Sequence, residues 1–307
     1  MKLAIPDLIS NSYFPAAAAI ELGFFRREGL DVELELISPT ENAYAALRDG
    51  EVDFVASSAH STLSAFPEWK GAKLLCAQSQ GMYWFLVMRS DLGARRGDLS
   101  CVKGRSIGAA PLVGLGLRQL LVEAGIDPER DGVRISPVPG SHGRDVSFGV
   151  TAANALTDGV IDGFWANGMA AELAVRNGIG TLVLDVRRGD GPPVCFNYTM
   201  PVVVTTERLI ERDPDLAAAA IRAVTALQAA VKENSELATE FGRRRFPETE
   251  AGLIADLIRR DLPFYEPHIS KTFVAKMCEF ARAVGLLTGD VAYDQVVAER
   301  FRHLWVR

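Results

Sequence analysis

Little in this sequence would support a metal site, a disulfide framework or a membrane anchor. The 307 residues include four cysteines, which lie far apart and form no CxxC pair, and four histidines that show no metal-ligand spacing. Isolated thiols of this kind are typical of buried apolar positions. No apolar run reaches the roughly 20 residues that a membrane helix requires. We therefore expect no metal, no cofactor and no direct insertion into a membrane.

The chain also lacks the basic surface of a nucleic-acid-binding protein. Its formal charge is −6, and its short basic cluster, Arg243–Arg245, is typical of a solvated helix end. With 48% hydrophobic and 23% charged residues, the composition is that of an ordinary globular protein, and the length suits two domains. Nucleic acid is therefore not an expected partner.

The N-terminus leaves the cellular location open. The first residues, MKLAIPDLIS, lead into a predicted strand and contain no apolar segment with the cleavage site of a signal peptide. Either the protein is cytoplasmic, or it is periplasmic or otherwise extracytoplasmic and its export signal has been removed.

One phrase occurs twice in the sequence. The pattern Ala-Leu-x-Asp-Gly-x-(Val/Ile)-Asp occupies residues 46–53 and again residues 155–162. Each copy ends a predicted helix at Asp-Gly, where glycine tolerates a left-handed backbone, and then starts a short apolar strand. A strand, a helix and a second strand are predicted before each of these helices, so both halves follow the order strand, helix, strand, helix, strand. In the first half, Ser38, Pro39 and Glu41 also predict a capping box at the start of the helix.

This alternation of strands and helices predicts an α/β fold with two similar lobes, each built on a mainly parallel sheet with helices on both faces. We expect lobe 1 to comprise residues 1–87 and 200–307, including the C-terminal helices, and lobe 2 to comprise residues 88–199. Ligands of open parallel sheets bind beyond the carboxyl ends of the strands, so we expect a ligand cleft between the lobes.

The candidate ligand residues follow from this rule, because they come directly after predicted strands or close to the crossings between lobes. Helices expected to begin near Pro15 and Gly114 would add backbone amides, which favour an anionic group. Aromatic side chains are frequent at the same positions, and polar-tipped aromatics suit a ligand with a flat ring or an apolar body. The predicted ligand-binding residues are Asn11, Ser12, Tyr13, Ser57, Ser58, His60, Trp84, Pro111, Gly114, Arg118, Trp165 and Asn167.

His60 is the candidate for acid–base chemistry in this set. It follows a predicted strand within Ser-Ser-Ala-His, and an imidazole titrates close to neutral pH, as a general base requires. The alternative is a structural histidine that caps or bridges to the next helix. Arg118 also has two interpretations, as a partner of a ligand carboxylate or sulfonate and as a surface residue. His142 and Arg144 are expected in a solvated loop.

Longer motifs carry a resemblance to a known family. They are NSYFPAAAAIELGFFRREGLDVE (11–33), ALRDGEVDF (46–54), FLVMRSD (85–91) and VKGRSIG (102–108). The chain resembles type II periplasmic-binding-protein-like domains, in the branch that holds taurine, alkanesulfonate and thiamine-pyrimidine-precursor binding proteins and the thiamine pyrimidine synthases. The likeness covers roughly residues 3–240, and its motifs belong to the scaffold.

The resemblance implies a solute-binding protein that captures a small organic ligand, aromatic or heteroaromatic and partly anionic, for the permease of an ABC importer. The alternative is a cytoplasmic enzyme of the same fold, such as a pyrimidine synthase, a desulfinase or a decarboxylase-like enzyme, acting on a small aromatic substrate. Two departures count against the enzymes. The clustered cysteine motif of the synthases is absent, and the loop that carries the desulfinase cysteine here contains Asn11-Ser12-Tyr13. A binder without catalytic residues is the leading interpretation, and His60 is the catalytic candidate if the protein is an enzyme.

Overall fold

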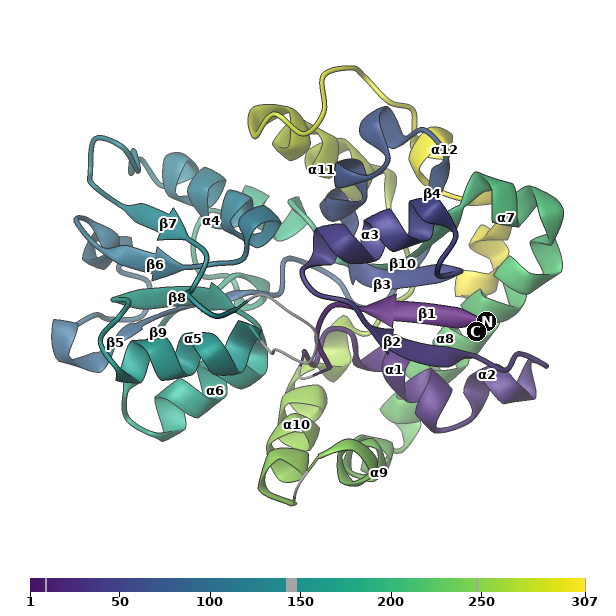
Figure 1. Ribbon diagram of the computed structural model, residues 1–307, viewed down its shortest axis with the longest axis horizontal. Helices are drawn as coiled ribbons and strands as arrows, with labels where there is room; N and C mark the ends of the chain where they lie inside the picture. The colour runs from purple at the N-terminus through teal and green to yellow at the C-terminus, as the bar shows by residue number, and fades with distance from the viewer. Residues whose placement is uncertain (9, 142–147, 247, 307) are drawn as a thin grey trace. The chain divides into compact units, whose positions relative to one another are not determined.

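The chain folds into two α/β units (Figure 1). The computed structural model describes residues 1–8, 10–141, 148–246 and 248–306. The first unit comprises Met1–Gly81 and Thr199–Arg307, and the second comprises Met82–Tyr198. The boundary expected after residue 87 lies earlier here, because the strand β5 (Phe85–Arg89) belongs wholly to the second sheet.

The first unit contains a five-stranded sheet in the order β2-β1-β3-β10-β4. β1 pairs in parallel with β2 and with β3, whereas β10 runs antiparallel to both β3 and β4. The register of β10 against β4 shifts between Val203 and Val204. The strands are β1 (Lys2–Ile5), β2 (Glu33–Leu36), β3 (Phe54–Ser58), β4 (Ala72–Ala77) and β10 (Pro201–Thr206).

The second unit repeats this arrangement in the order β7-β6-β8-β5-β9. β6 pairs in parallel with β7 and with β8, and β5 runs antiparallel to β8 and β9. A register shift again interrupts the last pair, between Leu86 and Val87. The other strands are β6 (Ser106–Gly108), β7 (Arg134–Ser136), β8 (Gly163–Ala166) and β9 (Gly180–Asp185). The predicted fold of two similar, mainly parallel α/β lobes is confirmed.

The glycines of the repeated phrase end two equivalent helices. Gly50, after α3 (Thr40–Asp49), has a φ of 79°, and Gly159, after α5 (Phe148–Thr157), has a φ of 69°. Both values lie in the left-handed region that favours glycine. The next amide then bonds back to the helix, at 2.9 Å to the Ala46 carbonyl in the first unit and at 2.9 Å to the Ala155 carbonyl in the second.

The last aspartates of the phrase anchor β1 in the first sheet and β6 in the second, each the middle one of three parallel strands. Asp53 Oδ2 accepts the backbone N–H of Lys2 at 2.9 Å, and Asp162 Oδ2 accepts that of Ser106 at 2.9 Å. In return the backbone N–H of Asp53 donates to the Lys2 carbonyl, and that of Asp162 donates to the Ser106 carbonyl, both at 2.9 Å. Each aspartate therefore holds its following strand to the strand at the centre of the parallel pairs.

Helices cover both faces of each sheet (Figure 1). In the first unit α3 lies on one face, and α1 and α8 lie on the other; in the second unit α4 lies on one face, and α5 and α6 lie on the other. α8 buries the apolar side chains of Ile221, Val224, Leu227 and Val231. The other helices of this part of the chain are α1 (Phe14–Glu21), α2 (Phe24–Arg27), α4 (Pro111–Glu123), α6 (Gly168–Arg176), α7 (Glu207–Arg212) and α8 (Pro214–Glu233).

The predicted capping box of α3 is wrong. The helix begins at Thr40, Pro39 occupies the N-cap position, and proline has no side-chain group that could cap the first turn. The carbonyl of Ser38 instead accepts a bond from the side-chain Nδ2 of Asn42 at 3.4 Å. Proline at the N-cap places Ser38 one residue too early to reach the free amides of the first turn.

The C-terminal part of the chain packs onto the first unit. It forms α9 (Glu236–Arg245), α10 (Glu248–Asp261), α11 (Lys271–Ala283) and α12 (Tyr293–Val296). Beyond α12, Val297 pairs in parallel with Leu74 of β4, and the indole N–H of Trp305 donates to the Leu75 carbonyl at 2.9 Å. These contacts cover the edge of β4, whose backbone groups would otherwise be open to pairing with another chain.

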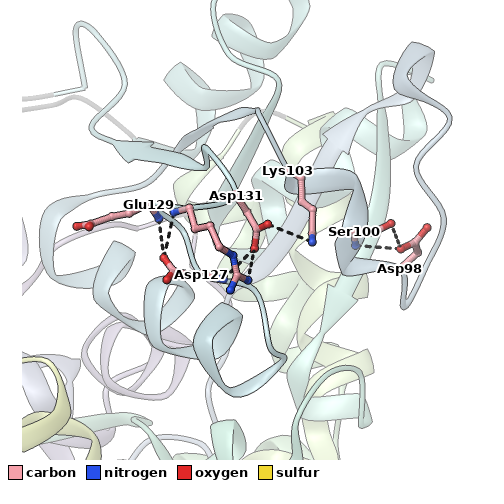
Figure 2. Close-up of polar contacts among 7 residues, drawn as sticks. Asp98, Ser100, Lys103, Asp127, Glu129 and Asp131 are labelled. Atoms are coloured by element: carbon pink, nitrogen blue, oxygen red, sulfur yellow. Dashed lines mark hydrogen bonds and ion pairs between the residues drawn. The ribbon is translucent and has the colours of Figure 1, made fainter.

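A polar network holds two loops of the second unit together (Figure 2). Lys103 Nζ lies 3.2 Å from Asp131 Oδ1, and Asp131 Oδ2 accepts the backbone N–H of Asp127 at 3.0 Å. Nearby, Asp98 Oδ1 accepts the hydroxyl of Ser100 at 2.6 Å and its N–H at 2.9 Å, which lowers the pKa of the Asp98 carboxyl. Lys103 precedes β6 and Asp131 precedes β7, so the network lies where the parallel strands begin, opposite the edge that carries the predicted ligand residues.

Candidate functional site

In the first unit, several predicted residues meet at one edge of the sheet. Because β1 and β3 are parallel and β10 is antiparallel to β3 and β4, the carboxyl ends of β1, β3 and β4 lie beside the start of β10. Ser57 and Ser58 end β3 at this edge, and His60 follows them. Gln78 follows β4, and Thr199 precedes β10. This is the edge at which open α/β sheets bind ligands.

The two serines that end β3 differ in what their hydroxyls contact. Ser58 Oγ lies 2.6 Å from Ser61 Oγ, and the Ser58 carbonyl accepts the Tyr44 hydroxyl at 2.8 Å. Burial raises the pKa of Tyr44, so this phenol stays neutral and remains a donor. Ser57 Oγ is buried and has no hydrogen-bond partner among the described residues. Ser57 is therefore the serine with a free polar group for a ligand.

His60 is completely buried and bridges two segments of the first unit. Its Nδ1 lies 3.0 Å from Thr199 Oγ1, just before β10, and its ring packs edge-on against Phe280 of α11 with centroids 5.5 Å apart. These contacts are what a structural histidine between η1 (Ala59–Ser64) and its neighbours would make.

The loop after β1 is held by the C-terminal part of the chain. The side-chain amide nitrogen of Asn11 donates to the carboxylate of Asp261, and the Tyr265 hydroxyl donates to the Asn11 carbonyl at 2.7 Å. Asn11, Ser12 and Tyr13 are all buried, and the Tyr13 N–H closes a turn to Ser10 at 3.0 Å. Ser10 Oγ is a second buried hydroxyl without a hydrogen-bond partner in the described part of the chain.

The start of α1 is already partly occupied. Its Ala16 N–H, expected to be free for an anion, donates to Gln78 Oε1 at 3.2 Å. The helix begins at Phe14, close to the expected start, and Tyr13 stands at its N-cap. The expectation of free backbone amides at the helix start near Pro15 therefore does not hold for Ala16, because Gln78 reaches it from the end of β4.

In the second unit, an aromatic cluster forms at the corresponding edge. β5 is antiparallel to β8 and β9, so Tyr83 and Trp84, which precede β5, lie at the carboxyl ends of those strands. The rings of Tyr83 and Trp84 are 4.8 Å apart, and those of Trp84 and Trp165 are 6.2 Å apart. A Cβ atom on Gly116 of α4 would come within 3.3 Å of Trp84, so the helix packs closely over this ring.

Arg187 and the Trp165 indole add polar groups to this cluster. Arg187, which follows β9, is buried, and its guanidinium carbon lies 5.6 Å from the centre of the Tyr83 ring. That distance allows a cation–π interaction. Trp165 is fully buried, and no described residue accepts its Nε1–H. The cluster therefore combines apolar ring faces, a cation and an unused donor.

The other predicted residues of the second unit have different surroundings. Pro111 is the exposed first residue of α4, and Arg118 is exposed on the same helix. Gly114, expected near the start of a helix, lies inside α4, where a Cβ atom would meet Ile135 at 3.2 Å. Asn167 caps α6 through an Oδ1 bond of 3.3 Å to the Ala170 N–H. Gly114 and Asn167 thus have packing and capping roles, and His142 and Arg144 lie outside the described residues.

Gln78 and Arg187 were not in the predicted set, although the repeat carries a signal for them. Gln78 follows β4 and Arg187 comes shortly after β9, and these strands occupy the same place in the two sheets. Had the repeat been extended to the last strand of each sheet, both residues would have been found.

Metal binding and thiol chemistry find little support in the described residues. Among them, no group of three histidine, cysteine, aspartate or glutamate side chains is placed to hold a metal ion. All four cysteines are free thiols. Burial raises the pKa of Cys76 and Cys195 to about 12 and that of Cys101 and Cys278 to about 11, so none is a ready thiolate nucleophile.

No helix in the described part of the chain is both long enough and apolar enough to cross a bilayer.

Comparisons with solved structures found proteins of the same fold. The periplasmic nitrate-binding protein NrtA from Synechocystis PCC 6803 matches with a TM-score of 0.76 at 14% identity, covering 99% of this chain and 87% of that one. A putative sulfonate ABC transporter component, the periplasmic sulfonate-binding protein SsuA from Methylobacillus flagellatus KT, matches with a TM-score of 0.68 at 15% identity, covering 100% and 96%. A cysteine-to-serine mutant of DSZB in complex with biphenyl-2-sulfinic acid matches with a TM-score of 0.65 at 17% identity, covering 98% and 97%.

Sequence comparison identifies the family. No curated protein matches the chain. The NMT1/THI5-like family model matches residues 11–236, which is well over half of the sequence and includes the repeated phrase in both units. The chain therefore belongs to the NMT1/THI5-like family and has the type II periplasmic-binding-protein-like fold that its motifs predicted.

Proposed function

We propose that this protein is a solute-binding protein, which captures a small organic anion with an aromatic or heteroaromatic ring and passes it to the permease of an ABC importer. One observation carries the proposal. In the second unit, Tyr83, Trp84 and Trp165 gather at the edge where such sheets bind ligands, together with the buried guanidinium of Arg187.

This cluster has the chemistry of a pocket for an aromatic anion. Ring faces attract a flat apolar body by stacking, worth about 0.5–1.5 kcal/mol per pair beyond the area buried. The guanidinium of Arg187 is permanently charged and matches the geometry of a carboxylate or sulfonate. The Trp165 N–H, which no described residue accepts, is a donor for the same group.

The first unit has polar groups at its own strand-end edge. The hydroxyls of Ser10 and Ser57 are buried and have no hydrogen-bond partner among the described residues. A buried hydroxyl without a partner costs free energy, so a ligand that bonds to it recovers that cost. We propose that Asn11, Ser57 and their neighbours bind polar ligand groups at this edge of the first unit.

The proteins of the same fold support an anionic ligand. Nitrate and sulfonate are named for two of them, and biphenyl-2-sulfinic acid, which joins an oxyanion to an aromatic body, is bound by the third. Two of the three are described as periplasmic, and we propose an extracytoplasmic location for this chain as well.

Binding is favoured over catalysis by the state of the reactive groups. A desulfinase-type nucleophile would need a reactive thiol in the loop after β1, where Asn11-Ser12-Tyr13 stands, and all four thiols of the chain have raised pKa values. The His60 ring is enclosed between Thr199 and Phe280, away from solvent. A general base must reach the proton that it removes.

Titration calorimetry tests the proposal with matched probes. We would compare 4-methylbenzenesulfonate and 4-methylbenzoate with the neutral 4-methylbenzamide, and with two non-aromatic probes, the zwitterion taurine and the anion nitrate. The aromatic anions are expected to bind with a dissociation constant near about 1 μM, and the neutral or non-aromatic probes at least about tenfold more weakly. Tightest binding of taurine or nitrate would contradict the aromatic ligand, and no binding of any probe at about 1 mM would contradict the function.

A further inference from the structure

The loop that carries Asn11 is fixed by residues from the far end of the chain. Asp261 ends α10, Tyr265 follows it, and both side chains are completely buried. The Asn11 amide nitrogen donates to Asp261 Oδ2, and the Tyr265 hydroxyl donates to the Asn11 carbonyl at 2.7 Å. The Tyr265 ring also packs against Phe14 of α1, with centroids 5.8 Å apart. Both the side chain and the backbone of Asn11 are therefore held from outside the loop.

These contacts come from a part of the chain that the family model does not reach. The model ends at residue 236, whereas Asp261 and Tyr265 lie beyond it. Nothing in the family likeness therefore assigns a role to Asp261.

An ionised carboxylate determines which way an asparagine amide points. A carboxylate only accepts hydrogen bonds, whereas the amide has a donor nitrogen and an acceptor oxygen. Pairing with Asp261 therefore turns the NH2 group of Asn11 toward the carboxylate and its Oδ1 away from it. Arg260 Nε lies 3.7 Å from the other Asp261 oxygen and supplies a compensating charge. Charge-assisted bonds of this kind are about twice as strong as neutral ones.

We propose that Asp261 is a positioning residue, which orients Asn11 so that its Oδ1 is offered to the ligand. Asn11 then selects ligands that carry an N–H or O–H donor, because only a donor satisfies Oδ1. The inference rests on the proposed function, since it takes Asn11 as a ligand contact. It adds to that function a second chemical requirement on the ligand.

A matched pair of probes measures this selection. 4-Aminobenzenesulfonate and 4-methylbenzenesulfonate have the same ring and the same anion, and they differ only in an amino donor or a methyl group. The wild-type protein is expected to bind the amino probe about tenfold or more tightly, because the methyl probe leaves Oδ1 without a partner. Asn11→Ala should bring the ratio of the two dissociation constants close to one.

Asp261→Asn is the decisive variant. An amide at position 261 can donate as well as accept, so the Asn11 amide is no longer fixed, and the ratio should fall by about tenfold. Asp256→Asn is the control, because Asp256 lies on the exposed side of α10 and pairs at the surface with Arg259, at 3.4 Å. Its ratio should stay at the wild-type value. Melting temperatures of all variants report whether each one folds.

The outcomes separate the inference from the proposed function. If neither probe binds the wild-type protein, the proposed function fails. If both probes bind the wild-type protein equally, the function stands and the inference is overturned. A folded Asp261→Asn variant that keeps the wild-type ratio also overturns it. Should Asp261→Asn fail to fold, the wild-type ratio and its loss in Asn11→Ala still decide whether Asn11 accepts from the ligand.

Discussion

Replacing Trp165 with phenylalanine should weaken ligand binding and leave the stability of the protein nearly unchanged. Trp165 is fully buried in β8, and its indole N–H has no acceptor among the described residues. Phenylalanine keeps an aromatic ring in the same place and removes only the N–H and the second ring. The substitution therefore tests the unused donor without emptying the core.

The expected magnitudes follow from this environment. Removing a buried donor that lacks a partner raises the free energy of unfolding of the unliganded protein by about 1–3 kcal/mol. The smaller ring loses packing worth about 1–3 kcal/mol, so the two effects nearly cancel in the free energy of unfolding. In the complex, by contrast, the ligand loses the bond to the N–H, and its dissociation constant should rise about tenfold to a hundredfold. Calorimetric titration gives the binding change, and chemical denaturation gives the stability change.

The chain offers two tryptophan controls for this experiment. Trp69 Nε1 is also buried without a partner in the described part of the chain, but Trp69 lies just before β4, away from the ligand edge. Trp69→Phe should therefore change neither the dissociation constant of the ligand nor the free energy of unfolding. Trp305→Phe removes a bond of 2.9 Å to the Leu75 carbonyl and should cost about 1 kcal/mol of stability without affecting the ligand. Unchanged affinity in Trp165→Phe, or an equal loss in Trp69→Phe, would refute the argument.

Three further predictions concern Arg187, the repeated aspartate and a surface carboxylate. Arg187→Gln should weaken an aromatic sulfonate by about tenfold or more and leave its neutral analogue unchanged in the same titration, because bonds to charged groups contribute about 1.5–3 kcal/mol. Asp162→Ala should lower the free energy of unfolding by about 1–3 kcal/mol, since it leaves the Ser106 N–H at the start of β6 without its acceptor; an unchanged denaturation midpoint would contradict this. Glu68→Gln should lower the melting temperature at pH 7, and the difference from wild type should shrink as the pH falls below about 4. Bonds from the Thr288 hydroxyl, its N–H and the Gly289 N–H lower the pKa of Glu68, so its stabilisation is present above the unfolded value of about 4.3 and is lost as the pH falls through the folded pKa. A difference between variant and wild type that stays constant as the pH falls would contradict that assignment.

The fold could be predicted because its signals are local. Gly50 and Gly159 need a left-handed backbone, and Asp53 and Asp162 bond to the neighbouring strand, so the same short phrase marks the same junction twice. Each half also shows its strands and helices in the same order. The capping box was mispredicted because Pro39, and not Ser38, stands at the N-cap of α3.

The candidate site could be predicted only in part, because much of it depends on contacts between distant segments. Strand-end positions identified Ser57 and Trp165, whose polar groups have no partner in the described residues. No local pattern, however, shows that Asp261 reaches Asn11, 250 positions away. Gly114 and Asn167 fit the same strand-end pattern, yet they pack and cap helices of the second unit.

The central claim is that this protein binds a small aromatic anion and does not transform it. Mass spectrometry of the purified protein, mixed with a pool of sulfonates, pyrimidines and aromatic acids, tests this most directly. After washing and denaturation, we expect to recover one unaltered aromatic anion, which at about one hundred times its dissociation constant would also stabilise the fold by about 2.7 kcal/mol. Depletion of a compound with the appearance of a new mass would contradict a binding role and would identify an enzyme.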